Sequence, residues 1–351
     1  MKKSIFIFSL ITILFLGMGC SKSENNASVT NLSVIVHFAD HIAYQMYSDM
    51  KTEALELEAR VQTLKTKPTQ ANLIAAQEQW LTLRTLWEYS EAFLFGPISD
   101  LDLDPSWDDW PVNHRDFDAI LLSNDNISKD YVANLSTSSK GFHALEYILF
   151  GINKSKIADS LKSRELDYAV ALSQNITTTA TTNIEAWEGS KGFLNTLKTP
   201  SATNTTYKNN KSALLEIAHA LIGICEETGE TKINSVFTAQ NPSLEESQFS
   251  QNSMNDFKAN IAGVEMVYLG TYKKAGPSLS SLVQLHNKSL DIKIKSAITE
   301  DKLSLNQVTD PFGVALTTQP NAINNAVVRI HTLATLLETE LLPLLQLKIN
   351  D

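Results

Sequence analysis

The sequence predicts an all-α protein made of two helical bundles packed side by side. Three observations support this fold class. Only 13 glycines and 10 prolines occur in 351 residues, so long stretches of the chain are uninterrupted by residues that break helices. Apolar residues within those stretches recur at the spacing of one helix face. No stretch shows the strict apolar–polar alternation of a half-buried strand.

The N-terminal half contains four expected helices. In the first, apolar residues from Val34 to Leu57 recur near every fourth position. The second ends at Gly96-Pro97, because proline cannot continue a helix. Residues 97–112 are rich in aspartate and are expected to form a loop. The four helices are predicted at 31–65, 70–95, 113–122 and 141–150.

The second half repeats this style without repeating the sequence. Clusters of proline, glycine and small polar residues separate long stretches of helical period. We therefore predict an N-terminal bundle over residues 30–152 and a C-terminal bundle over residues 153–351. The helices of the C-terminal half are expected near 157–188, 207–240, 252–274, 278–300 and 321–348.

The first residues resemble an export signal. Lys2 and Lys3 precede an apolar run that is shorter than the ~20 residues of a membrane span. Small residues then lead to Cys20, as in a bacterial lipoprotein processing site. We predict a signal peptide over residues 1–19, a tether over residues 20–29, and attachment to a membrane of the cell envelope through lipid on Cys20. The alternative is an ordinary secretory signal in which Cys20 is incidental.

Composition narrows the class of partner. Without residues 1–19 the chain keeps 27 basic and 39 acidic side chains, a net charge of −12. This balance argues against nucleic acid as a partner and is compatible with cations. If Cys20 carries lipid, Cys225 has no partner for a disulfide within the chain. Stability must then come from the burial of apolar side chains.

The stretch 141–150 carries the most informative pair of residues. His143 and Glu146 stand three positions apart on an otherwise apolar helix, so they share one face. A carboxylate in such surroundings is costly unless it is paired or bound to a metal ion. Two ligand-type side chains within reach of one ion would explain the pattern. A hydrogen bond between His143 and Glu146 that joins the two bundles would explain it equally well.

Further candidates lie on the helix 70–95 and in the loop after it. Arg84 and Glu91 fall on the same stripe of the helix as two tryptophans. Arg84 and Glu91 are roughly 10 Å apart along the helix axis. Glu91 could face His143 as a ligand or an acceptor, or it could form a salt bridge between helices. Asp109 is held between a second aspartate and Trp110-Pro111, where a rigid loop could fix a carboxylate.

Several familiar sites are excluded. The chain has no His-Glu-x-x-His motif, no Gly-x-Ser-x-Gly elbow and no phosphate-binding glycine loop. The alternating aspartates from Asp100 onward start like a calcium loop. Proline stands where that loop needs its glycine and its final glutamate, at Pro105 and Pro111.

The motif Gly141-x-His143-x-x-Glu146 resembles the Gly-x-His-x-x-Glu signature of the imelysin family. The flanks match as well: Trp80-x-x-x-Arg84-x-x-Trp87-x-x-x-Glu91, then Trp110-Pro111, and later Asp256-x-x-x-Asn260-Ile261-x-Gly263. The resemblance implies two helical bundles with the signature near their junction, metal binding and a role in iron acquisition. It makes His143 and Glu146 the proposed site. Its other candidate residues are Glu91, Arg84, Asp109, Trp110, Asp256 and Asn260, although relatives often carry asparagine or another polar residue in place of Asp109.

Three functions remain open at this point. The first is an exported lipoprotein that binds a metal ion through His143, Glu146 and Glu91 and works with iron-transport partners. Carboxylate oxygens with one imidazole favour iron and would also accept zinc. The second is a metallopeptidase of the imelysin type, with Glu146 or Glu91 as general base for metal-bound water and His143 as a ligand. Such an enzyme usually needs three protein ligands and an open coordination position. The third is a lipoprotein that binds another ligand or a protein without any metal.

Overall fold

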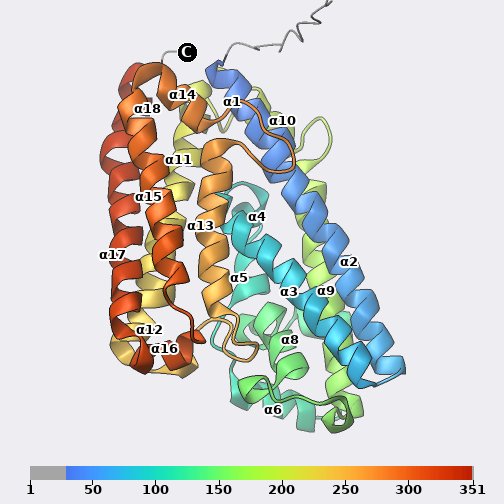
Figure 1. The fold of residues 1–351 in the computed structure, drawn as a ribbon. Coiled ribbons are helices and arrows are strands. Elements are labelled where there is room, and N and C mark those ends of the chain that lie inside the picture. Colours follow the sequence, from blue (N-terminus) through green and yellow to red (C-terminus); the bar gives the residue numbers. More distant parts are fainter. Residues whose placement is uncertain (1–28, 350–351) are drawn as a thin grey trace, which may run out of the picture.

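The computed structural model describes residues 29–349, and these residues contain helices and no strand (Figure 1). The all-α prediction is therefore confirmed. The expected signal peptide, Cys20 and residues 20–28 of the expected tether lie outside the described residues. Within residues 29–349, every helix is too short or too polar to cross a bilayer.

One group of helices contains most of the N-terminal half. α1 (Asn31–Phe38) runs through a π-helical turn (Ala39–Ala43) into α2 (Tyr44–Thr66). α2 packs along both α3 (Gln70–Ser90) and α9 (Ser163–Trp187). α8 (Gly141–Phe150) lies against α3 and α9 and has the predicted bounds. Its apolar face meets Trp80, whose Nε1 donates to the Phe142 carbonyl.

The second group lies beside the first (Figure 1). α11 (Asn210–Glu226) continues through a π-helical stretch (Glu227–Asn234) into α12 (Ser235–Ala239). α17 (Pro320–Leu336) packs on α11 and on α15 (Lys288–Asn306). α13 (Ser253–Leu269) packs on both α15 and α3, and so joins the two groups. Among the described residues, buried Cys225 of α11 has no disulfide partner.

The contact between α13 and α3 depends on a glycine. A Cβ atom at Gly263 would lie 2.5 Å from the Tyr89 carbonyl oxygen of α3. Only a residue without a side chain therefore allows the two backbones to approach this closely. This explains Gly263 in the Asp256–Gly263 motif as a packing residue, and it sets the polar face of α13 directly against α3.

The prediction of a loop over residues 97–112 was wrong in part. This stretch contains two short helices, α4 (Pro97–Asp100) and α5 (Asp104–Asp108). Trp107 is buried, and its Nε1 donates to the Ile176 carbonyl of α9. The single helix expected at 278–300 is divided into α14 (Leu279–His286) and α15. The remaining α-helices are α6 (His114–Leu122), α7 (Lys129–Ala133), α10 (Phe193–Lys198), α16 (Phe312–Thr318) and α18 (Leu342–Lys348). The short 3-10 helical turns are Glu91–Phe93, Thr137–Ser139, Ile152–Lys154, Ala158–Ser160 and Pro242–Leu244. A π-helical turn (Leu337–Leu341) lies between α17 and α18.

The division into two domains after residue 152 stays a prediction. α9 follows residue 152 in the chain but packs along α2 and α8, which belong to the N-terminal half. The two groups of helices meet where α3, α8 and α13 come together, and the charged residues of the sequence motifs converge there.

Candidate functional site: a buried cluster of charged side chains

Nine charged or ionisable side chains meet in the interior between the two groups of helices. We call them the central charge cluster. They come from α3, α5, α8, the π-helical stretch after α11, the segment 241–252 that precedes α13, and α13 itself. Each exposes 5% of its surface or less. The members are Arg84, Glu88, Glu91, Asp108, His143, Glu146, Lys232, Glu246 and Asp256.

His143 is hydrogen-bonded on both sides of its ring. Nδ1 lies 2.9 Å from Glu146 Oε2, and Nε2 lies 3.0 Å from Asp108 Oδ1. Burial alone would lower the pKa of His143, but these two carboxylate partners raise it to about 9. At neutral pH the ring is therefore an imidazolium that donates both N–H groups. It offers no lone pair to a metal ion in this state.

The glycine of the motif explains how Asp108 reaches His143. Gly141 has φ +75°, and a Cβ atom there would collide with the Trp107 carbonyl. α8 thus begins directly against the backbone of α5. This contact places Asp108, the last residue of α5, beside the imidazole of His143 in the first turn of α8.

Glu146 links α8 to the segment 241–252, which we call the strap. Glu146 Oε1 accepts hydrogen bonds from Ser250 N at 2.7 Å and from Ser250 Oγ at 2.6 Å. Its other oxygen pairs with His143. Both carboxylate oxygens of Glu146 are therefore satisfied within the protein. Of the two explanations that the sequence left open, a shared metal ion or a hydrogen bond between His143 and Glu146, the hydrogen bond is the contact present.

Arg84 lies fully buried among acidic side chains. It forms ion pairs with Asp108 and Glu88, and its Nη2 is 2.8 Å from Glu246 Oε1. Asp108 also accepts from Trp87 Nε1 at 2.5 Å. Burial would raise the pKa of Asp108, but the charges of Arg84, His143 and Lys232 and the hydrogen bond from His143 together outweigh burial and hold that pKa below its usual range.

Lys232 binds three carboxylates at once. Its Nζ lies 2.6 Å from Glu91 Oε2, 2.9 Å from Glu246 Oε1 and 3.1 Å from Glu88 Oε2. Asn260 Nδ2 also donates to Glu91 at 2.6 Å and to Glu88 at 2.8 Å. The carboxylates raise the pKa of Lys232 although burial opposes them, so the ammonium stays charged.

The cluster holds six carboxyl groups against three cationic side chains. Burial raises the pKa of Glu91 and of Asp256 well above the usual range, and it raises the pKa of Glu246 to about 7. Within residues 29–349, Glu246 Oε2 and Asp256 Oδ2 have no hydrogen-bond partner, and Glu88 Oε1 has only its ion pair with Arg84. Bound protons or a bound cation must balance this excess of acid.

Most of the sequence candidates meet in this cluster, though not all in the expected contacts. Glu91 pairs with Lys232 and Asn260 rather than with His143. Partly exposed Trp110 covers the outside of the cluster: Lys232 Nζ lies 5.6 Å from its ring centre, and the His143 ring lies 6.3 Å away. Asp109 instead accepts a hydrogen bond from Thr137 Oγ1. Its neighbour Asp108 is the carboxylate that turns inward.

Sequence reasoning missed Glu88, Lys232, Glu246 and the hydroxyl of Ser250. Glu88 stands four positions after Arg84 on α3, the spacing of an ion pair on one helix, and could have been found. Lys232 and Glu246 lie in polar stretches where a charged residue is unremarkable. Only the packing of the strap and the π-helical stretch against α3 brings them inside.

The donor atoms are of a kind that can hold a metal ion. Two groups of three each offer ligand atoms within 4.8 Å of one another: Asp108, His143 and Glu246, and Glu88, Glu246 and Asp256. Carboxylate oxygens with one imidazole suit iron and also accept zinc. The unpartnered oxygens lie in the second group, which consists of oxygen donors alone.

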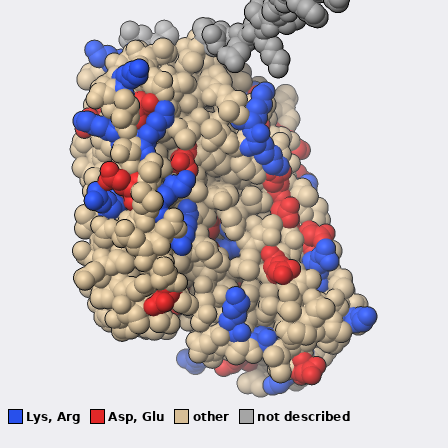
Figure 2. All heavy atoms as spheres, viewed as in Figure 1, with Lys and Arg blue, Asp and Glu red and all other residues tan. Residues whose placement is uncertain are grey.

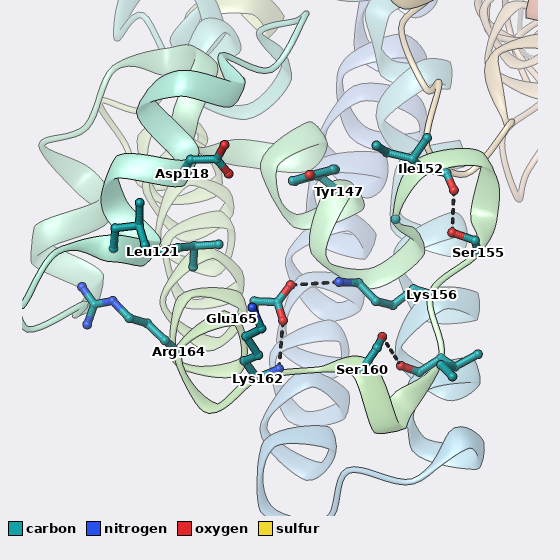
Figure 3. A pocket seen from close by; sticks show the side chains of 13 residues that line it. Asp118, Leu121, Tyr147, Ile152, Ser155, Lys156, Ser160, Lys162, Arg164 and Glu165 are labelled. Atoms are coloured by element: carbon teal, nitrogen blue, oxygen red, sulfur yellow. Dashed lines mark hydrogen bonds and ion pairs between the residues drawn. The ribbon is translucent and has the colours of Figure 1, made fainter.

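The surface offers different chemistry. A pocket of about 690 Å³ lies at the outer side of α8, with Tyr147 and Ile152 among its lining residues and a Lys156–Glu165 ion pair of 2.8 Å (Figure 3). No member of the central charge cluster lines it. On the face shown in Figure 2, acidic and basic side chains are interspersed.

Comparison with known proteins agrees with this architecture. The family model for imelysin (Peptidase_M75) matches residues 43–339. Iron-regulated protein A of Synechococcus elongatus is 26% identical over 346 residues, which cover 94% of this chain and 93% of that protein.

Two solved structures are similar as well. A crystal structure designated an iron-regulated protein A precursor, from Parabacteroides distasonis, is 25% identical with a TM-score of 0.82 and covers 93% of this chain and 97% of its own. An imelysin-like protein from Psychrobacter arcticum is 17% identical with a TM-score of 0.74, over 90% of this chain and 96% of its own, and shares the fold. Because the family model spans most of the sequence, including the Gly141–Glu146 motif, this chain belongs to the imelysin family.

Proposed function

We propose that this protein is an exported, lipid-anchored lipoprotein that binds a metal ion, with iron favoured, in the central charge cluster as part of iron acquisition. The name of the Synechococcus relative, iron-regulated protein A, associates that protein with iron. The hard oxygen donors of the cluster are compatible with the same metal. In this proposal, lipid on Cys20 attaches the protein to a membrane of the cell envelope, where iron-transport partners would receive the ion.

One observation carries the proposal: among the described residues, the carboxylates of the cluster outnumber its cationic groups, and Glu246 Oε2 and Asp256 Oδ2 have no hydrogen-bond partner. An uncompensated carboxylate in a protein interior costs several kcal/mol. A bound cation would remove that cost in the folded protein. Protons on Glu91, Asp256 and Glu246 are the alternative, and a metal ion would have to displace them.

The role of the predicted ligands His143 and Glu146 can be tested directly. Each is satisfied by protein partners, so an ion at His143 must first remove a ring proton. The alternative is that the pair is structural and fastens the strap to α8 through Ser250. Variants at these two positions distinguish a ligand, which changes metal content, from a fastener, which changes stability alone.

The experiment is a measurement of metal content. The purified protein is incubated anaerobically with Fe²⁺, and in parallel with Zn²⁺, then desalted and analysed by mass spectrometry for bound metal. We expect stoichiometric iron in the wild type and in Asp109→Asn, a carboxylate variant outside the cluster. His143→Ala and Glu146→Ala are measured beside them, with melting temperatures to confirm folding. A wild-type protein that retains neither metal overturns the proposal.

Peptidase activity is the second candidate, and the family model carries that word in its name. Such chemistry needs an open coordination position that a peptide can reach. The cluster residues expose 5% of their surface or less, so a peptide would reach them only after a rearrangement. Digestion of a protein substrate that stops with chelator and in Glu146→Gln would establish this activity.

A further inference from the structure

We propose that the metal ion is held by three carboxylates from three separate elements, Glu88 of α3, Glu246 of the strap and Asp256 of α13, and not by the His143–Glu146 pair. The inference rests on the proposed function and assigns its ligands. The expected metal ion is a hard divalent cation such as Fe²⁺ or Mn²⁺, because every donor atom is an oxygen.

The three carboxylates converge from different directions. One oxygen from each lies within 4.8 Å of the other two. Oxygen ligands at ~2.0–2.6 Å from one ion stand at most about 5 Å apart, so the three atoms match a shared ion with little movement. All three side chains are 1% exposed or less. An ion between them would be shielded from water.

Within residues 29–349, two of the three residues keep one oxygen without a hydrogen bond or an ion pair. Glu246 Oε1 binds Lys232 and Arg84, which leaves Oε2 without a partner. Asp256 Oδ1 accepts from Asn252 Nδ2 at 2.6 Å, which leaves Oδ2. Glu88 Oε2 accepts from Lys232, whereas Oε1 faces Arg84 as an ion pair without a hydrogen bond.

The basic side chains hold these carboxylates in place without neutralising them all. Arg84 is shared with Asp108, and Lys232 is shared with Glu91, so neither charge is available to the trio alone. Arg84 Nε lies 3.8 Å from Asp256 Oδ1, too far for a hydrogen bond. Asp256 therefore has the longest ion pair of the cluster, and it is the residue for which an added cation would change most.

The His143–Glu146 pair has a different task in this arrangement. Both ring nitrogens and both carboxylate oxygens are already hydrogen-bonded. Ser250, which Glu146 binds, stands four residues after Glu246 on the strap. The pair therefore acts as a positioning element that fastens the strap and keeps Glu246 inside the cluster.

The first test needs no variant. The wild-type protein is loaded with Mn²⁺ alone, and electron spin echo envelope modulation (ESEEM) spectra are recorded to detect nitrogen bound to the metal. We expect no coupling to an imidazole nitrogen, because the assigned ligands are all oxygens. Strong nitrogen coupling, as from a coordinated histidine, overturns the assignment and leaves the proposed function standing.

The second test compares variants of similar shape. Asp256→Asn and Glu246→Gln each remove one charge, and we expect the Kd for Mn²⁺ to rise at least about tenfold in both. Asp109→Asn, whose carboxylate accepts from Thr137 outside the cluster, is the matched control, with a change within about threefold. Equal Kd values in the wild type, Asp256→Asn and Glu246→Gln overturn the inference. A wild-type protein that binds no Mn²⁺ or Fe²⁺ removes the proposed function itself, and a variant that fails to fold leaves the wild-type spectrum to decide.

Discussion

Replacement of Lys232 by methionine is the most informative single perturbation of the central charge cluster. Methionine has a similar length and no charge, so it removes one ammonium group and leaves Glu88, Glu91 and Glu246 without their shared donor. Asn260 keeps its bonds to Glu88 and Glu91. Glu246 keeps only Arg84.

The magnitude follows from the burial of the pairs. Removal of one partner from a buried ion pair costs ~3–5 kcal/mol, because the remaining charge is left uncompensated. Lys232 is 1% exposed, so screening by solvent does not reduce this figure. The pKa values of Glu91 and Glu246 are already raised, and both groups take up protons as the pH falls. The loss should therefore be largest near pH 8 and smaller near pH 5.

The assay is chemical denaturation of the metal-free protein at both pH values. Lys293→Met serves as control, because its pair with Glu340 is 55% and 40% exposed and should contribute less than about 1 kcal/mol. A Lys232→Met variant no less stable than Lys293→Met at pH 8 would refute the reasoning. The carboxylates would then be neutralised by something other than the lysine.

Three further predictions concern the contacts around the cluster. The folded-state pKa of His143 is raised to about 9 from 6.5. The stability that the charged ring contributes is therefore complete below ~pH 6.5, and about 3 kcal/mol of it is lost as the pH rises through 9. Denaturation at pH 6 and pH 9.5 should show this loss in the wild type and not in His143→Gln. Ser250→Ala removes one of two hydrogen bonds to Glu146 and should lower the free energy of unfolding by about 1–3 kcal/mol, and an unchanged value contradicts this contact. Gly263→Ala forces a Cβ against the Tyr89 carbonyl and should cost about 1–3 kcal/mol in thermal unfolding; a variant as stable as the wild type would show that α3 and α13 can separate freely.

The elements that the sequence predicted best are those with clear local signals. Helix 141–150 has its predicted bounds, because Gly151 ends it in a left-handed conformation and its apolar face is continuous. α4 and α5 were missed because helices of four and five residues have little stability of their own. Their stability comes from tertiary contacts such as buried Trp107 against α9.

The residues of the candidate site show the same difference between local signals and tertiary contacts. Arg84, Glu91, His143 and Glu146 could be found because charge on an apolar helix face must be compensated. Which of two adjacent aspartates turns inward depends on the backbone at the end of α5, so composition and spacing could not select Asp108 over Asp109.

Lys232 and Glu246 show what lies beyond a linear sequence. They belong to the π-helical stretch and the strap, and both become buried only when the second group of helices docks on α3. The charge balance of the interior, on which the proposed metal site depends, therefore became visible only in three dimensions.

Anomalous diffraction at the iron absorption edge, from crystals of Fe²⁺-loaded wild-type protein, tests the metal site most directly. We expect one strong peak within bonding distance of the carboxylates of Glu88, Glu246 and Asp256. Crystals that contain iron elsewhere, with no peak anywhere in the central charge cluster, would contradict the site.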